Sequence, residues 1–340
     1  MNIASESQLE DVLSQPGEAD IRAAAALEGD LLILGVAGKM GPSLARRAVR
    51  ACERAGLRKR VTGVARFSGP GVERQLRDWG VETIAADLLE PGALARLPDA
   101  PNVIHMAARK FGSTGDEGLT WAMNTFLPGL VAERYRDSRI VAFSSGNVYP
   151  LSAVAGGGPT ESSPTAPVGE YAQSVLGRER IFEYHSRRHG TPVALLRLNY
   201  AIDLRYGVLL DIGRKVFERR PVDLRMGYAN VIWQGDANSA CLRSFALCQS
   251  PPAVINVTGP ETVSVRRAAM RFAEYFGTRP AFDGAESETA LLSNAARCRE
   301  LFGDPAVSVE QMIEWTANWI AIGGPTWNKP THFEVRDGKF

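Results

Sequence analysis

Three glycines are the residues whose type and spacing point most directly to chemistry. Gly35, Gly38 and Gly41 follow the apolar run Leu31–Leu34 in a G-x-x-G-x-x-G pattern. The first glycine permits a sharp turn after a strand, the second lets backbone N–H groups approach a pyrophosphate, and the third lets a helix pack closely on the sheet. The residues that follow begin an amphipathic helix, whose N-terminus favours an anion. The segment therefore predicts a site for the pyrophosphate of a dinucleotide.

Polar side chains recur at the ends of later segments. Residues 102–108 read as a strand that ends in small residues, which suits close approach by a flat ligand. Asn124 falls on a helix, Ser145 at the carboxyl end of an apolar run, and Tyr171 in the first turn of a helix. Taken singly, such a serine or tyrosine is more often a helix cap or a surface residue. Their order along the chain is what favours a functional role over a cap or surface position.

The elements that must position these residues alternate between strands and helices. Short apolar runs predict seven strands, at 31–35, 61–65, 82–85, 102–105, 139–143, 193–197 and 253–257. Helical stretches separate most of them, and this alternation predicts an α/β fold with a doubly wound parallel sheet. Ligands of such sheets bind at the carboxyl ends of the strands, where the polar residues fall.

The chain divides into three parts by pattern. We expect an N-terminal extension over 1–29, a dinucleotide-binding domain over 30–200 to which strand 253–257 returns, and a smaller substrate domain with a tail over 201–340. Helices are predicted near 209–219, 236–249, 264–276 and 308–322. The Gly- and Pro-rich loop 151–168 reads as either a functional lid or a disordered insertion. The tail from 325 either closes over the site or serves an interface.

Composition narrows the class of protein. A net charge of +1 over 340 residues gives no electrostatic case for nucleic acid or an anionic membrane. The N-terminus lacks a signal-peptide pattern and no apolar run is long enough to span a membrane, so we expect a cytoplasmic protein. The four cysteines are scattered, which favours reduced thiols, and no metal site is predicted.

Several motifs together resemble the extended short-chain dehydrogenase/reductase family of sugar-nucleotide epimerases and dehydratases. The glycine loop comes first, followed by a V-I-H-x-A-A segment at 103–108, an S-S-x-x-V-Y segment at 144–149 and a T-E-x-x-P-x-x-P segment at 160–167. Downstream, Arg-Leu-Asn-Tyr at 197–200 resembles the family's R-x-x-N segment, and residues 256–265 resemble its N-v-G…S-v segment. The likeness covers residues 30 to 275 and implies a Rossmann-type sheet.

The resemblance implies roles for three residues. Tyr171 would be the general acid/base that moves a proton as hydride passes to or from a nicotinamide, and Ser145 would orient the reacting oxygen. Asn124 would hold a water or backbone group in the proton relay. The family often dimerises through the helices that carry Asn124 and Tyr171, so a homodimer is expected.

One position departs from the family. The family has a lysine four residues after the tyrosine, which lowers the tyrosine pKa, and this chain has Val175. Without that cation, we expect the pKa of Tyr171 to stay near 10. Arg178 or a cation from the second domain could substitute, or another acid/base could act. Otherwise the chain is a redox-inactive dinucleotide-binding sensor or scaffold. We expect an enzyme, with the sensor as the alternative.

The cofactor is expected to be NAD or NADP. Arg66, without an acid at the end of the second predicted strand, suits a 2′-phosphate and favours NADP over NAD, and Lys39 adds positive charge nearby. Asp87 and Leu88 are placed like the family's adenine-contacting pair. The expected cofactor-binding residues are Gly35, Gly38, Lys39, Met40, Gly41, Arg66, Asp87, Leu88, Met106, Ala107, Ala108, Tyr171 and Asn199.

The substrate is expected to be a small carbohydrate-like molecule. Aromatic, amide and arginine side chains suit a sugar, sugar acid or sugar nucleotide. The predicted reaction takes place at a hydroxyl or keto group, as an oxidoreductase or an epimerase/dehydratase. The candidate substrate residues are Glu161, Tyr200, Arg205, Arg225, Asn230 and Trp233.

Overall fold

A seven-stranded parallel sheet forms the centre of the computed structural model, which describes residues 3–110, 112 and 115–339. The strand order is β12-β7-β5-β4-β1-β2-β3. The strands are β1 (Leu31–Leu34), β2 (Val61–Ala65), β3 (Glu82–Ala85), β4 (Asn102–His105), β5 (Arg139–Ser145), β7 (Val193–Leu198) and β12 (Ala253–Val257). Each predicted strand is present, and the doubly wound parallel sheet is confirmed.

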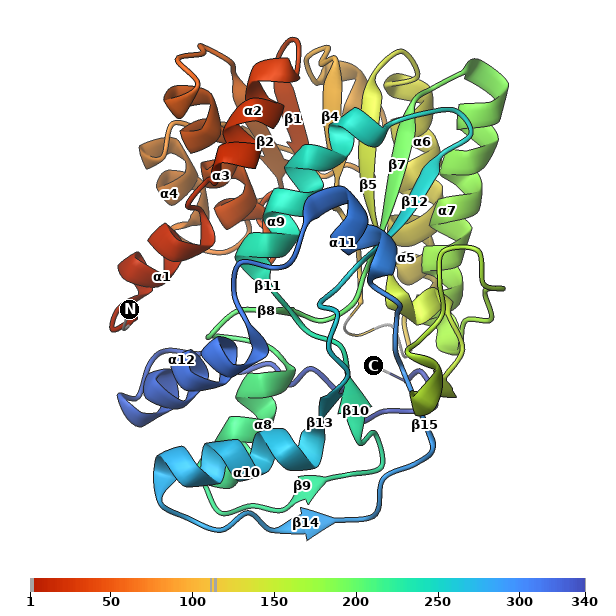
Figure 1. Cartoon of the computed structure of the whole chain (residues 1–340). Coiled ribbons are helices and arrows are strands. Elements are labelled where there is room, and N and C mark those ends of the chain that lie inside the picture. The colour runs from red at the N-terminus through yellow and green to blue at the C-terminus, as the bar shows by residue number, and fades with distance from the viewer. Residues whose placement is uncertain (1–2, 111, 113–114, 340) are drawn as a thin grey trace.

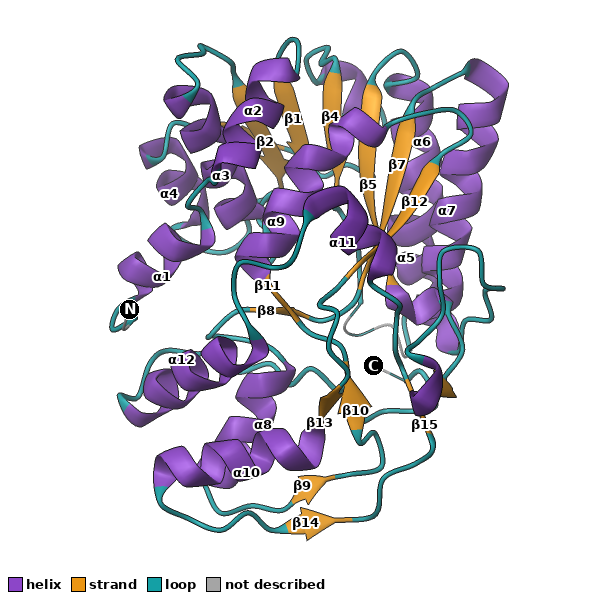
Figure 2. Ribbon diagram, viewed as in Figure 1, coloured by secondary structure: helices purple, strands orange, loops and turns teal. Residues whose placement is uncertain are grey.

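Helices cover both faces of the sheet (Figure 2). Successive strand residues therefore enter different apolar clusters. Ile33 joins the cluster that contains Leu44, whereas Leu34 joins the cluster that contains Phe182. The first face carries α2 (Glu18–Ala26), α3 (Gly41–Arg54) and α9 (Gln234–Arg243), and the second carries α6 (Leu127–Arg134) and α7 (Gly169–His189). Burial on both faces explains why these strands are continuously apolar.

A smaller lobe lies in the lower part of Figure 1. Its helices α8 (Val208–Phe217), α10 (Val265–Phe276) and α12 (Val309–Ala321) pack against one another. Two-residue strands pair around them: β8 (Ala201–Ile202) with β11 (Ile232–Trp233), β9 (Val222–Asp223) with β14 (Phe282–Asp283), β10 (Tyr228–Ala229) with β13 (Val263–Ser264), and β6 (Ser152–Ala153) with β15 (Thr289–Ala290). The remaining helices are α4 (Val72–Asp78), α5 (Glu117–Trp121) and α11 (Ala296–Phe302), and a π-helical turn (Ala122–Phe126) links α5 to α6.

Both ends of the chain hold the lobe to the sheet. In α1 (Glu6–Leu13), Leu9 and Leu13 are buried in the apolar cluster of the lobe. In α2, Asp20 accepts hydrogen bonds from Arg47 of α3. The tail crosses the lobe and brings Gly338 against Gly169, the first residue of α7. The extension and the tail thus both contact parts of the chain that are distant in sequence.

The helices and the cysteines bear on two further expectations. No helix among the described residues combines the length and the apolar character that crossing a bilayer requires. All four cysteines are free thiols, three of them buried.

Candidate active site

The glycine loop turns the chain sharply between β1 and α3. Gly35 has a φ of +91°, and a Cβ there would lie 2.6 Å from the backbone nitrogen of Ala107. A Cβ at Gly41 would lie 2.0 Å from the carbonyl oxygen of Val36, so only glycine fits at both positions. A Cβ at Gly38 would partly fill the turn, 3.3 Å from the Gly35 oxygen. Met40 stands at the N-cap of α3 and its side chain accepts no hydrogen bond from the helix, which suits the binding of a pyrophosphate by the first N–H groups.

A cavity of about 170 Å³ opens beside this loop, at the carboxyl ends of the strands. Six predicted site residues line it: Lys39, Met40, Ser145, Tyr171, Asn199 and Tyr200. Further lining residues include Lys110 from the loop after β4, Asn147 after β5, Tyr206 before α8, and Thr331 from the tail. The tail therefore forms part of the cavity wall. The sequence had left two roles open for it, closure over the site or a place in an interface.

Tyr171 and Ser145 meet in this cavity. Burial raises the pKa of Tyr171, and the nearby Arg178 charge and a hydrogen bond with Ser145 partly oppose that rise. The Ser145 hydroxyl donates to Asn147 Oδ1 at 2.9 Å and accepts from the Asn147 backbone nitrogen at 3.2 Å. The phenol is thus a proton donor at neutral pH, and its pKa lies above the value expected from the sequence.

Val175 leaves an apolar position one turn after Tyr171. It is buried in a small cluster with Val148 and Tyr149, against which Tyr171 packs. Arg178 lies one turn further along α7 and donates to the carbonyl oxygen of Phe143 at 2.7 Å. Burial lowers the pKa of Arg178 to about 10, so the guanidinium remains charged at neutral pH. Its charge favours ionisation of Tyr171, as a substitute cation would.

Two lysines bring further positive charge to the cavity. The Lys110 ammonium lies 5.8 Å from the centroid of the Tyr171 ring. The Lys39 ammonium donates to the carbonyl oxygen of Ala201 at 2.6 Å and lies 4.4 Å from the centroid of the Tyr206 ring. Burial lowers the pKa of Lys110 to about 8 and that of Lys39 to about 7. Lys39 therefore reaches into the cavity that holds Tyr171.

Sequence reasoning missed Lys110 because it belongs to no motif. Its only signal was a basic residue shortly after the carboxyl end of a predicted strand, where ligand-binding residues of parallel sheets gather.

Asn124 is fully buried and is not among the residues that line the cavity. Its amide accepts from the Arg109 backbone nitrogen at 2.9 Å and donates to the Arg109 carbonyl at 2.8 Å and to Ser174 at 3.0 Å. Arg178 also donates to Asn124 Oδ1 at 2.8 Å. Asn124 thus joins the loop after β4 to α7, and it fixes the segment that carries Lys110.

The predicted adenine-side residues lie at the ends of β2 and β3. The Arg66 guanidinium is 3.8 Å from the Asp87 carboxylate, and 68% of the Arg66 side chain is exposed. Leu88 and Ala107 are buried nearby in one apolar cluster with β1 and β4 residues. An acidic and a basic side chain therefore stand together where the ribose of a dinucleotide binds in this fold.

Most of the predicted substrate residues are engaged away from the cavity. Arg205 is buried and pairs with Asp203 and Glu10 at 2.7 Å each. Arg225 is exposed and pairs with Asp223. These arginines were singled out by residue type, and neighbouring carboxylates hold them instead.

Three of the other four substrate candidates also make their contacts outside the cavity. Trp233 is buried in the core of the lobe and packs edge-on against Trp315. Asn230 bonds the backbone of Glu261 and Ser293. Glu161 accepts a hydrogen bond from the Asn256 backbone nitrogen at 2.8 Å. Only Tyr200 of the six substrate candidates is among the residues that line the cavity.

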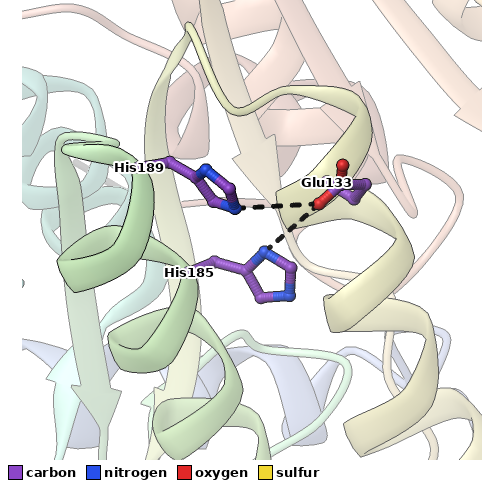
Figure 3. Close-up of side chains that lie close together, drawn as sticks. All are labelled: Glu133, His185 and His189. Carbon is purple, nitrogen blue, oxygen red and sulfur yellow. Dashed lines mark ion pairs between the residues drawn. The ribbon is translucent and has the colours of Figure 1, made fainter.

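A separate cluster of ligand-type side chains joins α6 and α7 (Figure 3). One carboxylate oxygen of Glu133 lies 3.7 Å from His185 Nδ1 and 3.9 Å from His189 Nε2. Burial lowers the pKa of His185, which favours its neutral form at pH 7. His185 lies 14 residues after Tyr171, or about 21 Å along the helix axis. The three side chains therefore lie between two helices, at a distance from the cavity.

Solved structures share this architecture at low sequence identity. An epimerase from Methanothermobacter thermautotrophicus is 18% identical, with a TM-score of 0.72 over 89% of this chain and 96% of that one. UDP-glucuronic acid 4-epimerase from Bacillus cereus is 18% identical, with a TM-score of 0.70 over 86% of this chain and 99% of that one. dTDP-glucose 4,6-dehydratase from Bacillus anthracis is 15% identical, with a TM-score of 0.72 over 86% and 97%. These likenesses confirm the fold.

Sequence comparison identifies the family. A comparison with curated proteins finds no match. The family model described as NAD dependent epimerase/dehydratase family matches residues 31–201, which is half of the chain and includes the glycine loop, Ser145 and Tyr171. This confirms the resemblance inferred from the motifs and supports the expectation of an enzyme. The chain therefore belongs to the NAD dependent epimerase/dehydratase family.

Proposed function

We propose that this protein is a nicotinamide-dependent enzyme that acts on a hydroxyl or keto group of a carbohydrate-like small molecule. The observation that carries the proposal is the cavity in which Tyr171 and Ser145 meet beside the glycine loop. The structural relatives support the substrate class, since one is a UDP-glucuronic acid 4-epimerase in complex with UDP-glucuronic acid and NAD. The proposal covers both an epimerase, which retains its cofactor, and a dehydrogenase, which exchanges it.

The cavity residues have distinct parts in the proposed reaction. The chemistry that a nicotinamide supplies when bound is hydride transfer. When the substrate binds, the Ser145 hydroxyl turns from Asn147 Oδ1 and donates its hydrogen bond to the reacting oxygen, which it orients. Tyr171 gives a proton to that oxygen during reduction and takes it back during oxidation. Arg178 and Lys110 supply the positive charge that the family's lysine would supply, because both lie near the Tyr171 ring.

The preference for NADP over NAD remains part of the proposal. Arg66 supports NADP because its exposed guanidinium can bond a 2′-phosphate, whereas Asp87 beside it could bond a 2′-hydroxyl. Fluorescence titration of NADH and NADPH against the wild type and Arg66→Asp measures the preference. We expect the variant to shift by about tenfold toward NADH, because a bidentate partner is lost. An unchanged ratio of affinities would count against Arg66.

A homodimer through α5, α6 and α7 is also proposed. Five large apolar side chains on these helices and on the π-helical turn between α5 and α6 are 37–60% exposed: Leu119, Trp121, Phe126, Leu130 and Tyr184. Sedimentation velocity of the wild type and of Phe126→Glu tests the interface. A monomeric wild type would contradict it.

Absorbance at the reduced-nicotinamide band tests the function itself. Purified protein is incubated with NAD or NADP and a panel of sugars, sugar acids and sugar nucleotides, and products are separated to detect epimers. Turnover in the panel supports the enzyme. Val175 is the observation that favours the alternative, a redox-inactive sensor. Tight cofactor binding with no turnover and no epimerisation would support that alternative.

A further inference from the structure

Two of the four histidines of this chain stand together on α7. His185 and His189 are four residues apart, so their side chains lie on one face of the helix, one turn apart. Their ring centroids are 5.8 Å apart. Glu133 of the neighbouring helix α6 completes the group, and both imidazole rings approach its carboxylate (Figure 3). We call these three side chains the α6–α7 cluster.

The donor atoms of the α6–α7 cluster converge on one region. The same carboxylate oxygen of Glu133 lies 3.7 Å from His185 Nδ1 and 3.9 Å from His189 Nε2, and all three atoms lie within 4.8 Å of one another. Two ligand atoms on a tetrahedral zinc ion lie about 3.3 Å apart, since each is about 2.0–2.1 Å from the metal. Small rotations of the three side chains therefore suffice to enclose one ion.

Direct hydrogen bonds do not account for this arrangement. An N–H group that donates to a carboxylate lies about 2.7–3.2 Å from the oxygen, and both N···O distances in the cluster are longer. His185 Nδ1 is buried and has no hydrogen-bond partner among the described residues. Buried polar atoms in native proteins nearly always have a partner. A cation held between the three donor atoms would supply one to His185.

The donor set selects the kind of metal. Magnesium and calcium take oxygen ligands, whereas imidazole nitrogen favours zinc and its neighbours among the first-row transition metals. Two histidines and one glutamate form a set that binds zinc in proteins and leaves a fourth position for water. The Glu133 side chain is 59% exposed, so an ion can enter the cluster from solvent.

Two neighbours of His185 bear on the strength of binding. The Tyr184 ring packs edge-on against the His185 ring, with centroids 5.4 Å apart, and restricts its rotation. The Arg188 guanidinium donates to the Tyr184 hydroxyl at 2.6 Å, and its charge acts on His185. This positive charge opposes a cation, and the Glu133 carboxylate offsets it. We therefore expect weaker binding than at a site with two carboxylates.

We propose that Glu133, His185 and His189 bind a zinc ion that joins α6 to α7. Its part is structural, because His185 lies about 21 Å along the helix axis from Tyr171, beyond reach of the reacting centre. The inference does not depend on the proposed function. No metal site was predicted from the sequence, since two histidines at helical spacing reveal nothing of a third ligand that comes from another helix.

Competition with a chromogenic zinc chelator measures the affinity and the stoichiometry in the full-length protein. We expect one zinc ion per chain. Replacing any of the three ligands, in His185→Gln, His189→Gln or Glu133→Gln, should weaken binding by about tenfold or more. His332→Gln is the matched control, because it removes a histidine outside the cluster, and it should bind zinc as the wild type does. Zinc affinity that the three ligand variants leave unchanged would overturn the proposal.

Cobalt(II) in place of zinc identifies the donor atoms. A site of nitrogen and oxygen donors gives the visible bands of a four-coordinate cobalt ion without a thiolate-to-cobalt charge-transfer band. These bands should disappear in His189→Gln. Cys248 is the least buried of the four thiols and is the competing ligand. A charge-transfer band that is lost in Cys248→Ser would assign the metal to that thiol and contradict the α6–α7 site.

Thermal unfolding tests the structural role without reference to catalysis. Zinc at about 100 times its Kd should raise the Tm of the wild type by about 4 °C, and should leave that of His185→Gln unchanged. Magnesium should shift neither. Bound zinc that leaves the wild-type Tm unchanged would contradict a structural role.

Two further outcomes separate this site from others. Half a zinc ion per chain, lost in the same variants, would place the ion between two copies and overturn the single-chain site. Titration with NADH should give the same affinity with and without zinc. If neither NADH nor NADPH binds the wild type, the proposed function fails while the zinc site stands. Circular dichroism of each variant checks its fold.

Discussion

Charged residues behave differently in the parallel-sheet domain and in the smaller lobe. Lys39 and Lys110 follow strands of the sheet and end in the cavity beside Tyr171. Arg205 and Arg225 were also predicted to meet the substrate, yet each pairs with an aspartate two residues earlier in the chain. A loop at the carboxyl edge of a parallel sheet faces an opening, so its side chains project into it. In the lobe, Arg205 and Arg225 pair with nearby carboxylates and are not available to a substrate.

The largest effect is expected at Tyr171. Tyr171→Phe removes the proton donor but keeps the ring, so turnover should fall about 10²- to 10⁴-fold with little change in cofactor affinity. Steady-state kinetics with the best substrate of the panel measure it. Tyr184→Phe is the control, because Tyr184 lies on the same helix and is 53% exposed. Equal turnover in Tyr171→Phe and the wild type would remove Tyr171 from the mechanism. It would also weaken the contrast between a sheet domain that supplies reacting groups and a lobe that does not.

Arg205 should matter for stability rather than for binding. Arg205→Met leaves Asp203 and Glu10 buried without their cation, which should cost about 3–5 kcal/mol of unfolding free energy. Urea unfolding measures this loss, and substrate titration of the folded fraction should give an unchanged KM. A stable variant whose KM rises strongly would show instead that Arg205 contacts the substrate.

His105 should make the sheet domain sensitive to acid. Burial and the Arg178 charge hold the pKa of His105 well below its usual range, and both ring nitrogens are without a hydrogen-bond partner among the described residues. The unfolded chain therefore takes up a proton at about pH 6.5 before the folded protein does. Stability is present above that pH and is lost as the pH falls below it.

Urea unfolding between pH 5 and pH 8 measures this dependence. The wild type should lose stability below about pH 6.5, and His105→Leu should lose less over the same range. If His105 had no part in the acid sensitivity, the plots of unfolding free energy against pH for the wild type and His105→Leu would be parallel.

The smallest effect is expected at Arg225. Its guanidinium is exposed and pairs with Asp223 in water, which screens the pair, so Arg225→Ala should leave the unfolding free energy close to that of the wild type. Thermal unfolding and the KM for substrate should both match the wild type. A rise in KM would mean that the lobe contributes a charged residue to the substrate after all.

Much of the fold could be predicted because it depends on local patterns. Apolar runs such as Leu31–Leu34 are buried on both faces of the sheet. Such strands can be recognised from their own residues, without knowing which strands they pair with. The four predicted helices after residue 200 are present near their expected bounds, except that the one predicted over 236–249 ends as an α-helix at Arg243. A 3₁₀ turn over Ser244–Leu247 continues it, which periodicity alone does not distinguish.

The candidate site was only partly predictable. Gly35, Ser145 and Tyr171 stand in motifs whose spacing fixes their place, at strand ends for Gly35 and Ser145 and in the first turn of α7 for Tyr171. Trp233 and Arg205 were chosen by residue type, and type alone does not tell whether an aromatic ring enters a core or an arginine finds a carboxylate nearby.

The sequence by itself determined the glycine turn, the order of strands and helices along the chain, and the absence of a lysine after Tyr171. These depend on φ, on burial periodicity and on residue identity within a few positions. The tertiary structure alone decided which cations lie near Tyr171 and its cavity. Arg178 comes from α7 and acts on Tyr171, whereas Lys110 and Lys39 come from two loops and line the cavity, and only folding brings these charges together.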